Sequence, residues 1–244
     1  HGLRGDVKKT LQKLLPLLHK VSHPDWQAQI DEVLVQEQAG LDSREGMTPR
    51  NVITTLNRFL GENTPVATDV GQHQMWAAQY LNLKTSRRFL SSGGLGTMGF
   101  GMGAAIGAAL GCGERSVLVT GDGSFGMNLN ELATAVANQI PMVILLLDNN
   151  VLGMVRQWQT LFFNKHYSNT NLDARKTDFV KLAEAFGAEG SRALTIPELE
   201  DALAKAFSWN GPYLIDCAID RDEFVLPMLP PGGSMDDIIT RIGD

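Results

Sequence analysis

The sequence predicts an α/β protein with a doubly wound, mainly parallel sheet flanked by helices and preceded by a helical connector. From Met47 onward, short apolar strands alternate with helices, which is typical of βαβ units. The run from Met142 to Leu147 is apolar throughout, as expected of a strand buried on both faces of a parallel sheet. Residues 1–45 show helical spacing of apolar residues and contain no convincing strand.

Composition excludes several classes of protein. The chain has 244 residues, of which 43% are hydrophobic and 20% charged, a mixture too apolar for a disordered chain. Because the net charge is −6 and no basic run occurs, we expect no nucleic-acid partner. The stretch from Gly99 to Gly113 is shorter than the roughly 20 residues of a membrane span, so we expect no membrane partner. Cys112 and Cys217 are too few for a disulfide framework, which favours a reducing cytoplasm.

The two parts of the chain are predicted to be a connector, residues 1–45, and a main domain, residues 46–244. Val7 to Leu18 and Trp26 to Val35 place apolar residues at helical spacing. The stretch from Gln38 to Gly46 is polar and contains glycine, which predicts a linker. Since these helices need another surface to pack on, we interpret residues 1–45 as a connector and the tail of a further domain. No secretory signal is recognised in residues 1–20.

Local signals place the elements of the main domain. Thr48-Pro49 begins the first helix, Gly187 ends a later one, and Thr195 with Glu198 forms a capping box. The predicted strands are Pro65–Val70, Arg88–Leu90, Ser116–Thr120, Met142–Leu147 and Tyr213–Ile219. The predicted helices are Thr48–Leu60, His73–Leu81, Met98–Leu110, Asn128–Gln139, Thr177–Phe186 and Thr195–Phe207.

Four loops that follow predicted strands carry the residues suited to chemistry. In an open parallel sheet, ligands bind beyond the carboxyl ends of the strands. The four segments are Val70–His73, Ser91–Gly96, Gly121–Ser124 and Asp148–Asn150. Three of them contain glycine and two offer oxygen ligands for a hard cation. This clustering predicts a ligand site at one edge of the sheet.

Asp122 and Asn149 form the strongest candidate metal site. Asp122 is flanked by glycines at a strand end, and Asn149 ends the next strand in sequence. One βαβ step therefore places both side chains at the same edge. A carboxylate, an amide oxygen and two phosphate oxygens suit Mg²⁺, and glycine amides can approach a phosphate closely. A tight turn with a helix cap would explain Gly-Asp-Gly alone, but it does not explain Asn149 at this spacing.

Three further features leave alternatives open. Gly94 to Gly99 matches G-x-G-x-x-G, so a nicotinamide-binding fold is a rival. That rival explains neither the second glycine loop after Asp122 nor the asparagines of the next strand. His73 is either a phosphate contact or a capping or buried structural histidine. Glycine at every fourth position from Gly99 to Gly111 predicts a smooth helix face packed closely on the sheet.

Several motifs together resemble the catalytic subunits of the acetolactate synthase (acetohydroxyacid synthase) family, which use thiamin diphosphate (ThDP). Gly121–Gly123 followed by Asp148–Asn149 is similar to the ThDP-binding motif, whose usual ending is Asn-Asn. The narrower match lies in Val70–Trp76, Ser91–Gly99, Gly121–Phe125, Gly153–Trp158 and Leu226–Gly233. The resemblance runs nearly continuously from Met47 to Asp244.

This resemblance implies a role for each matching position. Mg²⁺ would be held by Asp122, the side chain of Asn149 and the main-chain carbonyl of Val151. The ThDP site would be lined by Val70, Gly71, Gln72, His73, Gly96, Met98, Gly123, Ser124, Leu152, Gly153 and Met154. Trp158 would shape the pocket for the second 2-oxo acid. The family motif usually ends in two asparagines, and this chain has Asp148 at the first of these positions. The metal ligand is the second residue, Asn149, so we expect metal binding to be retained.

The resemblance also implies a reaction, further cofactors and partners. The reaction is a ThDP- and Mg²⁺-dependent decarboxylating condensation of pyruvate with a second pyruvate or 2-oxobutanoate, which serves branched-chain amino-acid biosynthesis. Family enzymes are much longer, carry FAD in a central domain, and form homodimers or tetramers, sometimes with a regulatory subunit. Their catalytic glutamate lies in a pyrimidine-binding domain. We therefore expect no catalytic residue in this chain, which supplies half of a site, and we expect Glu131 to be structural. Such enzymes are cytoplasmic in bacteria and plastid or mitochondrial in eukaryotes.

Other functions remain as alternatives. Another ThDP carboligase or decarboxylase, such as a glyoxylate carboligase, would differ in the region of Gln157 and Trp158. A nicotinamide-dependent dehydrogenase would bind NAD without needing Mg²⁺. A catalytically inert domain would act only in assembly.

Overall fold

The structure is a computed structural model that describes residues 2–42 and 44–242. The chain divides into two units, His1–Arg44 and Glu45–Asp244. The first contains α1 (Val7–Leu14), the 3-10 turn η1 (Leu15–Leu17) and α2 (Pro24–Asp42). The linker predicted from Gln38 was wrong for residues 38–42, because α2 continues through them; one glycine in a helix costs only about 1 kcal/mol. Residue 43 lies outside the described residues.

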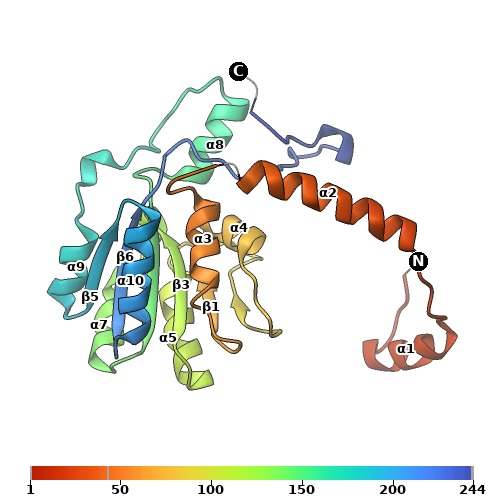
Figure 1. Cartoon of the computed structure of the whole chain (residues 1–244), viewed down its shortest axis with the longest axis horizontal. Helices are drawn as coiled ribbons and strands as arrows, with labels where there is room; N and C mark the ends of the chain where they lie inside the picture. The colour runs from red at the N-terminus through yellow and green to blue at the C-terminus, as the bar shows by residue number, and fades with distance from the viewer. Residues whose placement is uncertain (1, 43, 243–244) are drawn as a thin grey trace. The chain divides into compact units, whose positions relative to one another are not determined.

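The second unit is built on a six-stranded sheet in which every pairing is parallel (Figure 1). The strands are β1 (Val66–Thr68), β2 (Phe89–Leu90), β3 (Ser116–Gly121), β4 (Met142–Asp148), β5 (Glu189–Ala193) and β6 (Pro212–Ala218). Their order is β2-β1-β3-β4-β6-β5. The chain thus places β2 on one side of β1 and β3 on the other, so the strand order reverses between β1 and β3. A crevice at such a reversal is where open α/β sheets bind ligands.

Helices cover both faces of this sheet, which confirms the predicted fold class. The first core cluster contains residues of α3 (Pro49–Asn57), α4 (Gln72–Tyr80) and α10 (Ile196–Ser208). The second contains residues of α5 (Phe100–Cys112), α7 (Leu132–Ala137) and α9 (Phe179–Phe186).

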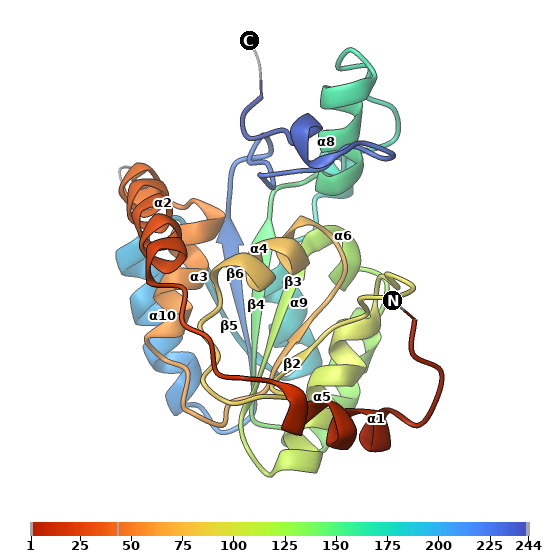
Figure 2. The same cartoon turned by 90° about the vertical axis from the view of Figure 1, so that its right-hand side faces the viewer.

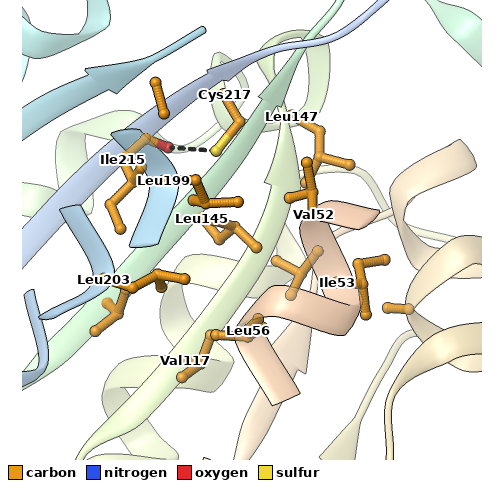
Figure 3. Close-up of a cluster of buried hydrophobic side chains, with 14 of the residues drawn as sticks. Val52, Ile53, Leu56, Val117, Leu145, Leu147, Leu199, Leu203, Ile215 and Cys217 are labelled. Carbon is orange, nitrogen blue, oxygen red and sulfur yellow. Dashed lines mark hydrogen bonds between the residues drawn. The ribbon is translucent and has the colours of Figure 1, made fainter. Parts of the chain in front are cut away.

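Neighbouring residues of a strand enter opposite clusters because successive side chains point to opposite faces. In β4, Leu145 and Leu147 pack in the first cluster (Figure 3), whereas Ile144 and Leu146 pack in the second. All seven residues of β4 are buried. The continuous apolar run of this strand therefore follows from burial on both faces.

The glycine-rich face of α5 does not pack on the sheet, so that prediction was wrong. A Cβ at Gly103, Gly107 or Gly111 would meet nothing within 4 Å. The close approach occurs instead at Gly101, where a Cβ would lie 2.5 Å from Leu118 Cδ1. The helix is apolar on all sides, so its sequence does not reveal which small residues face the strands.

Other differences concern elements with weak local signals. The helix predicted over Asn128–Gln139 is a 3-10 turn η2 (Leu129–Glu131) followed by the shorter α7. The edge strand β5 was not predicted, because Glu189–Ala193 is mainly polar. Helix α8 (Gly153–Phe162) was also missed, because no side chain caps its first turn. The remaining short elements are α6 (Asp122–Phe125), η3 (Asp173–Arg175) and η4 (Met235–Asp237). Both cysteines are free.

In residues 2–42 and 44–242, no helix is both long enough and apolar enough to cross a bilayer.

Candidate functional site

A cleft of about 250 Å³ lies at the carboxyl ends of β1, β3 and β4. The structure brings together in its lining every residue for which a cofactor or metal contact was expected. These residues are Val70, Gly71, Gln72, His73, Gly96, Met98, Asp122, Gly123, Ser124, Asn149, Val151, Leu152, Gly153 and Met154. Trp158 is not in this lining. It lines a neighbouring groove of about 830 Å³ that shares Met154 and Val155 with the cleft.

The imidazole ring of His73 packs closely against two glycines, Gly71 and Gly121. A Cβ on Gly71 would lie 2.8 Å from His73 Cε1, and one on Gly121 would lie 2.7 Å from His73 Nδ1. Burial lowers the pKa of His73 to about 4, although the charge of Asp69 opposes this shift. The imidazole is therefore neutral at pH 7. Its Nε2 atom is buried and has no hydrogen-bond partner among the described residues.

Asp69 and Ser124 tie the loops of the cleft to one another. Asp69 Oδ1 accepts hydrogen bonds from Gly99 N at 2.7 Å and from Val70 N at 3.2 Å. Ser124 Oγ accepts from the same two amides, at 3.3 and 3.4 Å. Thr120 Oγ1 donates to Asp69 Oδ2 at 3.3 Å. These contacts fix the loops after β1 and β3 and the start of α5 in one arrangement.

Asp122 is a buried carboxylate whose charge is only partly compensated. Arg175 Nη2 donates to Asp122 Oδ2 at 3.2 Å and to the Asp122 carbonyl oxygen at 3.0 Å. Burial raises the pKa of Asp122 to about 7, the charge of Asp148 adds to this rise, and Arg175 opposes it. A carboxylate held in this way is stabilised by an additional cation.

Asn149 lies in a tight turn directly after β4. Its Oδ1 atom accepts a hydrogen bond from Val151 N at 3.2 Å, and Asp148 Oδ1 accepts from Asn150 N at 3.1 Å. Asn149 lines the cleft, whereas neither Asp148 nor Asn150 does. Gly121 pairs with Leu147 in the β3–β4 register, so Asp122 and Asn149 lie at the ends of adjacent strands, one register position apart.

Gln72 begins α4 and reaches toward the first turn of α8. A Cβ on Gly153 would lie 2.0 Å from Gln72 Oε1, so only glycine fits there. Gln72 Oε1 is buried and has no hydrogen-bond partner among the described residues. Among the described residues of the lining, two buried side-chain atoms, Gln72 Oε1 and His73 Nε2, thus lack a hydrogen-bond partner. Such atoms lose free energy unless a ligand or water pairs with them.

The residues of the cleft fit a metal ion held jointly with a phosphate better than one enclosed by protein. Within the described ranges, no group of three or more His, Cys, Asp or Glu side chains could hold a metal ion. Asp122 and Asn149 instead offer one carboxylate and one amide oxygen. Mg²⁺ commonly takes one or two carboxylates and completes its shell with substrate phosphates and water.

Comparison with known proteins decides the family. The model of the thiamine pyrophosphate enzyme, C-terminal TPP binding domain, matches residues 69–217. The chain belongs to the thiamine pyrophosphate enzyme family. The matched region runs from Asp69 to Cys217 and so includes every residue of the cleft lining.

Similar curated proteins include acetolactate synthases, some of them named as large subunits. The chain is 40% identical to the probable acetolactate synthase large subunit of Methanocaldococcus jannaschii, with 98% of this chain and 42% of the relative aligned. It is 41% identical to isozyme 2 of Escherichia coli, over 99% of this chain and 44% of the relative. The chain is 38% identical to acetolactate synthase 1, chloroplastic, of Nicotiana tabacum, with 97% of this chain and 38% of the relative aligned. The chain thus spans about two fifths of the length of these relatives.

Asp69 and Arg175 contribute to this site but were not predicted from the sequence. Asp69 directly precedes the Val70–His73 loop, and the rule that strand ends carry function could have found it. Arg175 lies in η3, far from Asp122 in sequence, and no local signal marks it. Glu131 hydrogen-bonds within its own turn, where its Oε2 atom accepts from Thr134 Oγ1 at 2.8 Å.

Proposed function

We propose that this chain supplies the diphosphate- and Mg²⁺-binding half of an acetolactate synthase active site. The observation that carries this proposal is the convergence of Asp122, Asn149 and three glycine-bearing loops in one cleft, in a chain of the thiamine pyrophosphate enzyme family. In the proposed complex, Asp122, the side chain of Asn149 and the carbonyl of Val151 hold Mg²⁺. Mg²⁺ held there would neutralise part of the negative charge of the ThDP diphosphate.

The remaining residues of the cleft bind and orient the cofactor. Gly71, Gln72, His73, Gly123 and Ser124 contact the diphosphate, with a neutral imidazole and the free Gln72 oxygen pairing with polar groups of the ligand or its water. On the next loop, Leu152, Gly153 and Met154 flank the diphosphate. Val70, Gly96 and Met98 line the route toward the aminopyrimidine. When bound, ThDP supplies the carbanion-stabilising centre that protein side chains lack.

The proposed reaction joins pyruvate, after loss of CO₂, to a second pyruvate or to 2-oxobutanoate. Trp158 is the proposed specificity residue for the second 2-oxo acid. It lies in the groove that adjoins the cleft, with its ring 5.3 Å from that of Phe162 in an edge-on arrangement. The catalytic glutamate, FAD and the contacts of a homodimer or tetramer belong to parts of the full enzyme outside this chain. Residues 1–45 are proposed to be the connector from the central domain, and a regulatory subunit is a further proposed partner.

Calorimetric titration with ThDP, with and without Mg²⁺, tests this proposal, with NAD as the control ligand. We expect ThDP to bind only in the presence of Mg²⁺, with a Kd in the millimolar range, which corresponds to a binding free energy of about −4 kcal/mol. The affinity is low because half of the pocket comes from another domain. Binding of NAD without Mg²⁺ would instead support a dehydrogenase. In an enzyme reconstituted with the missing domains, Trp158→Leu should shift the ratio of products from the two second substrates, and an unchanged ratio would reject the role of Trp158.

A further inference from the structure

Gln157 is a fully buried polar residue on α8 that lies outside the cleft lining. Its Nε2 atom donates to Val225 O at 2.9 Å, and its Oε1 atom accepts from Val225 N at 2.9 Å. Gln157 Oε1 also accepts from Gln72 Nε2 at 2.9 Å. A buried amide is stable only when its polar atoms are paired. These bonds therefore hold the Gln157 side chain in one orientation.

The chain segment Glu223–Met228, here called the tail segment, is held through its backbone. Gln157 binds both backbone groups of Val225, and three residues on one face of α4 donate to neighbouring carbonyl groups. These bonds are Gln72 Nε2 to Glu223 O at 3.0 Å, Trp76 Nε1 to Phe224 O at 3.5 Å and Gln79 Nε2 to Leu226 O at 3.0 Å. Figure 2 shows α8 and the C-terminal part of the chain beyond the arrowheads of β4 and β6.

Gln72 belongs both to the cleft and to this network. Its Nε2 atom donates to Gln157 Oε1 and to Glu223 O, so its Oε1 atom must point the other way, toward Gly153. Without Gln157, Gln72 Nε2 would keep a single acceptor on the tail segment. The carboxamide would then be less firmly oriented, and its unpaired oxygen would no longer be held in one position against Gly153 of the cleft lining.

We propose that Gln157 is a positioning residue that orients Gln72 in the cleft and couples it to docking of the tail segment. The proposal deepens the proposed function and rests on it, since the ligand of the Gln72 loop is taken to be a diphosphate. A ligand that binds only when Gln72 is oriented in this way also stabilises the docked tail segment. Because the coupling free energy is reciprocal, docking of the tail segment increases the affinity for that ligand by the same factor.

The first experiment needs no ligand. Gln157→Met keeps the volume of the side chain but removes all four of its hydrogen bonds, including the one that Nε2 donates to Met228 Sδ at 3.4 Å. We expect faster amide hydrogen exchange at Val225, and we expect the NMR signals of the Gln72 side-chain NH₂ to move toward those of an exposed amide. Gln79→Ala is the matched control, because it also loses a bond to the tail segment but does not touch Gln72. Gln72 signals that stay unchanged in Gln157→Met would overturn the proposal.

The second experiment measures the affinity of the chain for ThDP and for inorganic pyrophosphate, each with Mg²⁺. We expect about a tenfold loss in Gln157→Met, a typical size for coupling through a shared network. The loss should vanish when Gln72 is already Met. Gln79→Ala weakens docking of the tail segment but keeps the bond between Gln157 and Gln72, so it should lose less affinity than Gln157→Met does. An equal loss in both backgrounds would mean that Gln157 does not act through Gln72.

A conservative variant separates positioning from general destabilisation. Glu in Gln157→Glu can still accept from Gln72 Nε2 and Val225 N but cannot donate to Val225 O. We expect the Gln72 side-chain NH₂ signals of Gln157→Glu to stay closer to the wild-type signals than those of Gln157→Met, and equal displacement in a folded protein would contradict the proposal. If the wild-type chain binds neither ligand, the proposed function fails, and the ligand-free experiment still decides the role of Gln157.

Discussion

Arg175 and Asp122 form a part-buried contact in which one guanidinium nitrogen, Nη2, donates to both the carboxylate and the backbone carbonyl of the aspartate, at 3.2 and 3.0 Å. The guanidinium also lies 5.5 Å from the centre of the Phe179 ring. Arg175 thus supplies a positive charge beside the carboxylate that we propose as a metal ligand. Because this charge would also repel Mg²⁺, the arginine and the metal are expected to compete for Asp122.

The first prediction concerns Arg175→Gln. The free energy of unfolding of the ligand-free chain at pH 8 should fall by about 1–2 kcal/mol, because Asp122 loses its partial neutralisation while solvent screens part of the effect. Mg²⁺ with pyrophosphate should restore more stability to the variant than to the wild type. Urea unfolding with and without these ligands measures both effects. Arg192→Gln, which breaks the more distant pair with Asp216, should show no such recovery.

The second prediction separates two neighbouring carboxylates. Asp122→Ala should abolish Mg²⁺-dependent diphosphate binding, because it removes the charged metal ligand of the proposed site. Asp148→Asn should retain binding, since Asp148 does not line the cleft. The same titration with ThDP and Mg²⁺ measures both variants. Retained binding in Asp122→Ala would reject the metal assignment, and lost binding in a folded Asp148→Asn would point to Asp148 instead.

The third prediction follows from the pKa of Asp216. Burial raises this pKa to about 6, with further contributions from the charge of Asp148. Because the folded value lies above the unfolded one, the folded state keeps the proton longer, and stability falls as the pH rises from about 4 to 6. Asp216→Asn should therefore stabilise the protein by about 2 kcal/mol at pH 8 and by little at pH 4. Urea unfolding at both pH values tests this, and an equal change at both would contradict the assigned cause.

The sequence predicted the sheet well where strands were apolar and bounded by clear loops. The strand around Val143 was recognisable because burial on both faces requires an uninterrupted apolar run. Strand β5 was not, because its residues lie at the sheet edge and its sequence is mainly polar. Local patterns could not reveal that edge strand, since its pairing with β6 is a tertiary contact.

Only part of the candidate site could be predicted from the sequence, namely the residues that directly follow predicted strands. Asp122 and Asn149 follow adjacent parallel strands, so topology alone brings them to one edge. Arg175 and the orientation of Gln157 depend instead on how loops fold back over that edge. A sequence pattern read along the chain carries no signal for such contacts.

The glycines of α5 provide the fourth prediction, in which two similar substitutions have opposite effects. Gly101→Ala should destabilise the fold by about 2–3 kcal/mol, because its Cβ would lie 2.5 Å from Leu118 Cδ1 and 2.9 Å from Asp69 N. Gly107→Ala should stabilise it by about 0.5–1 kcal/mol, because a Cβ there meets nothing within 4 Å and alanine favours the helix. Thermal and urea unfolding of the two variants measure both changes. If Gly107→Ala were destabilising and Gly101→Ala neutral, the rotation of α5 against the sheet would have to be revised, and the glycine-rich face would be the one that packs on β1 and β3.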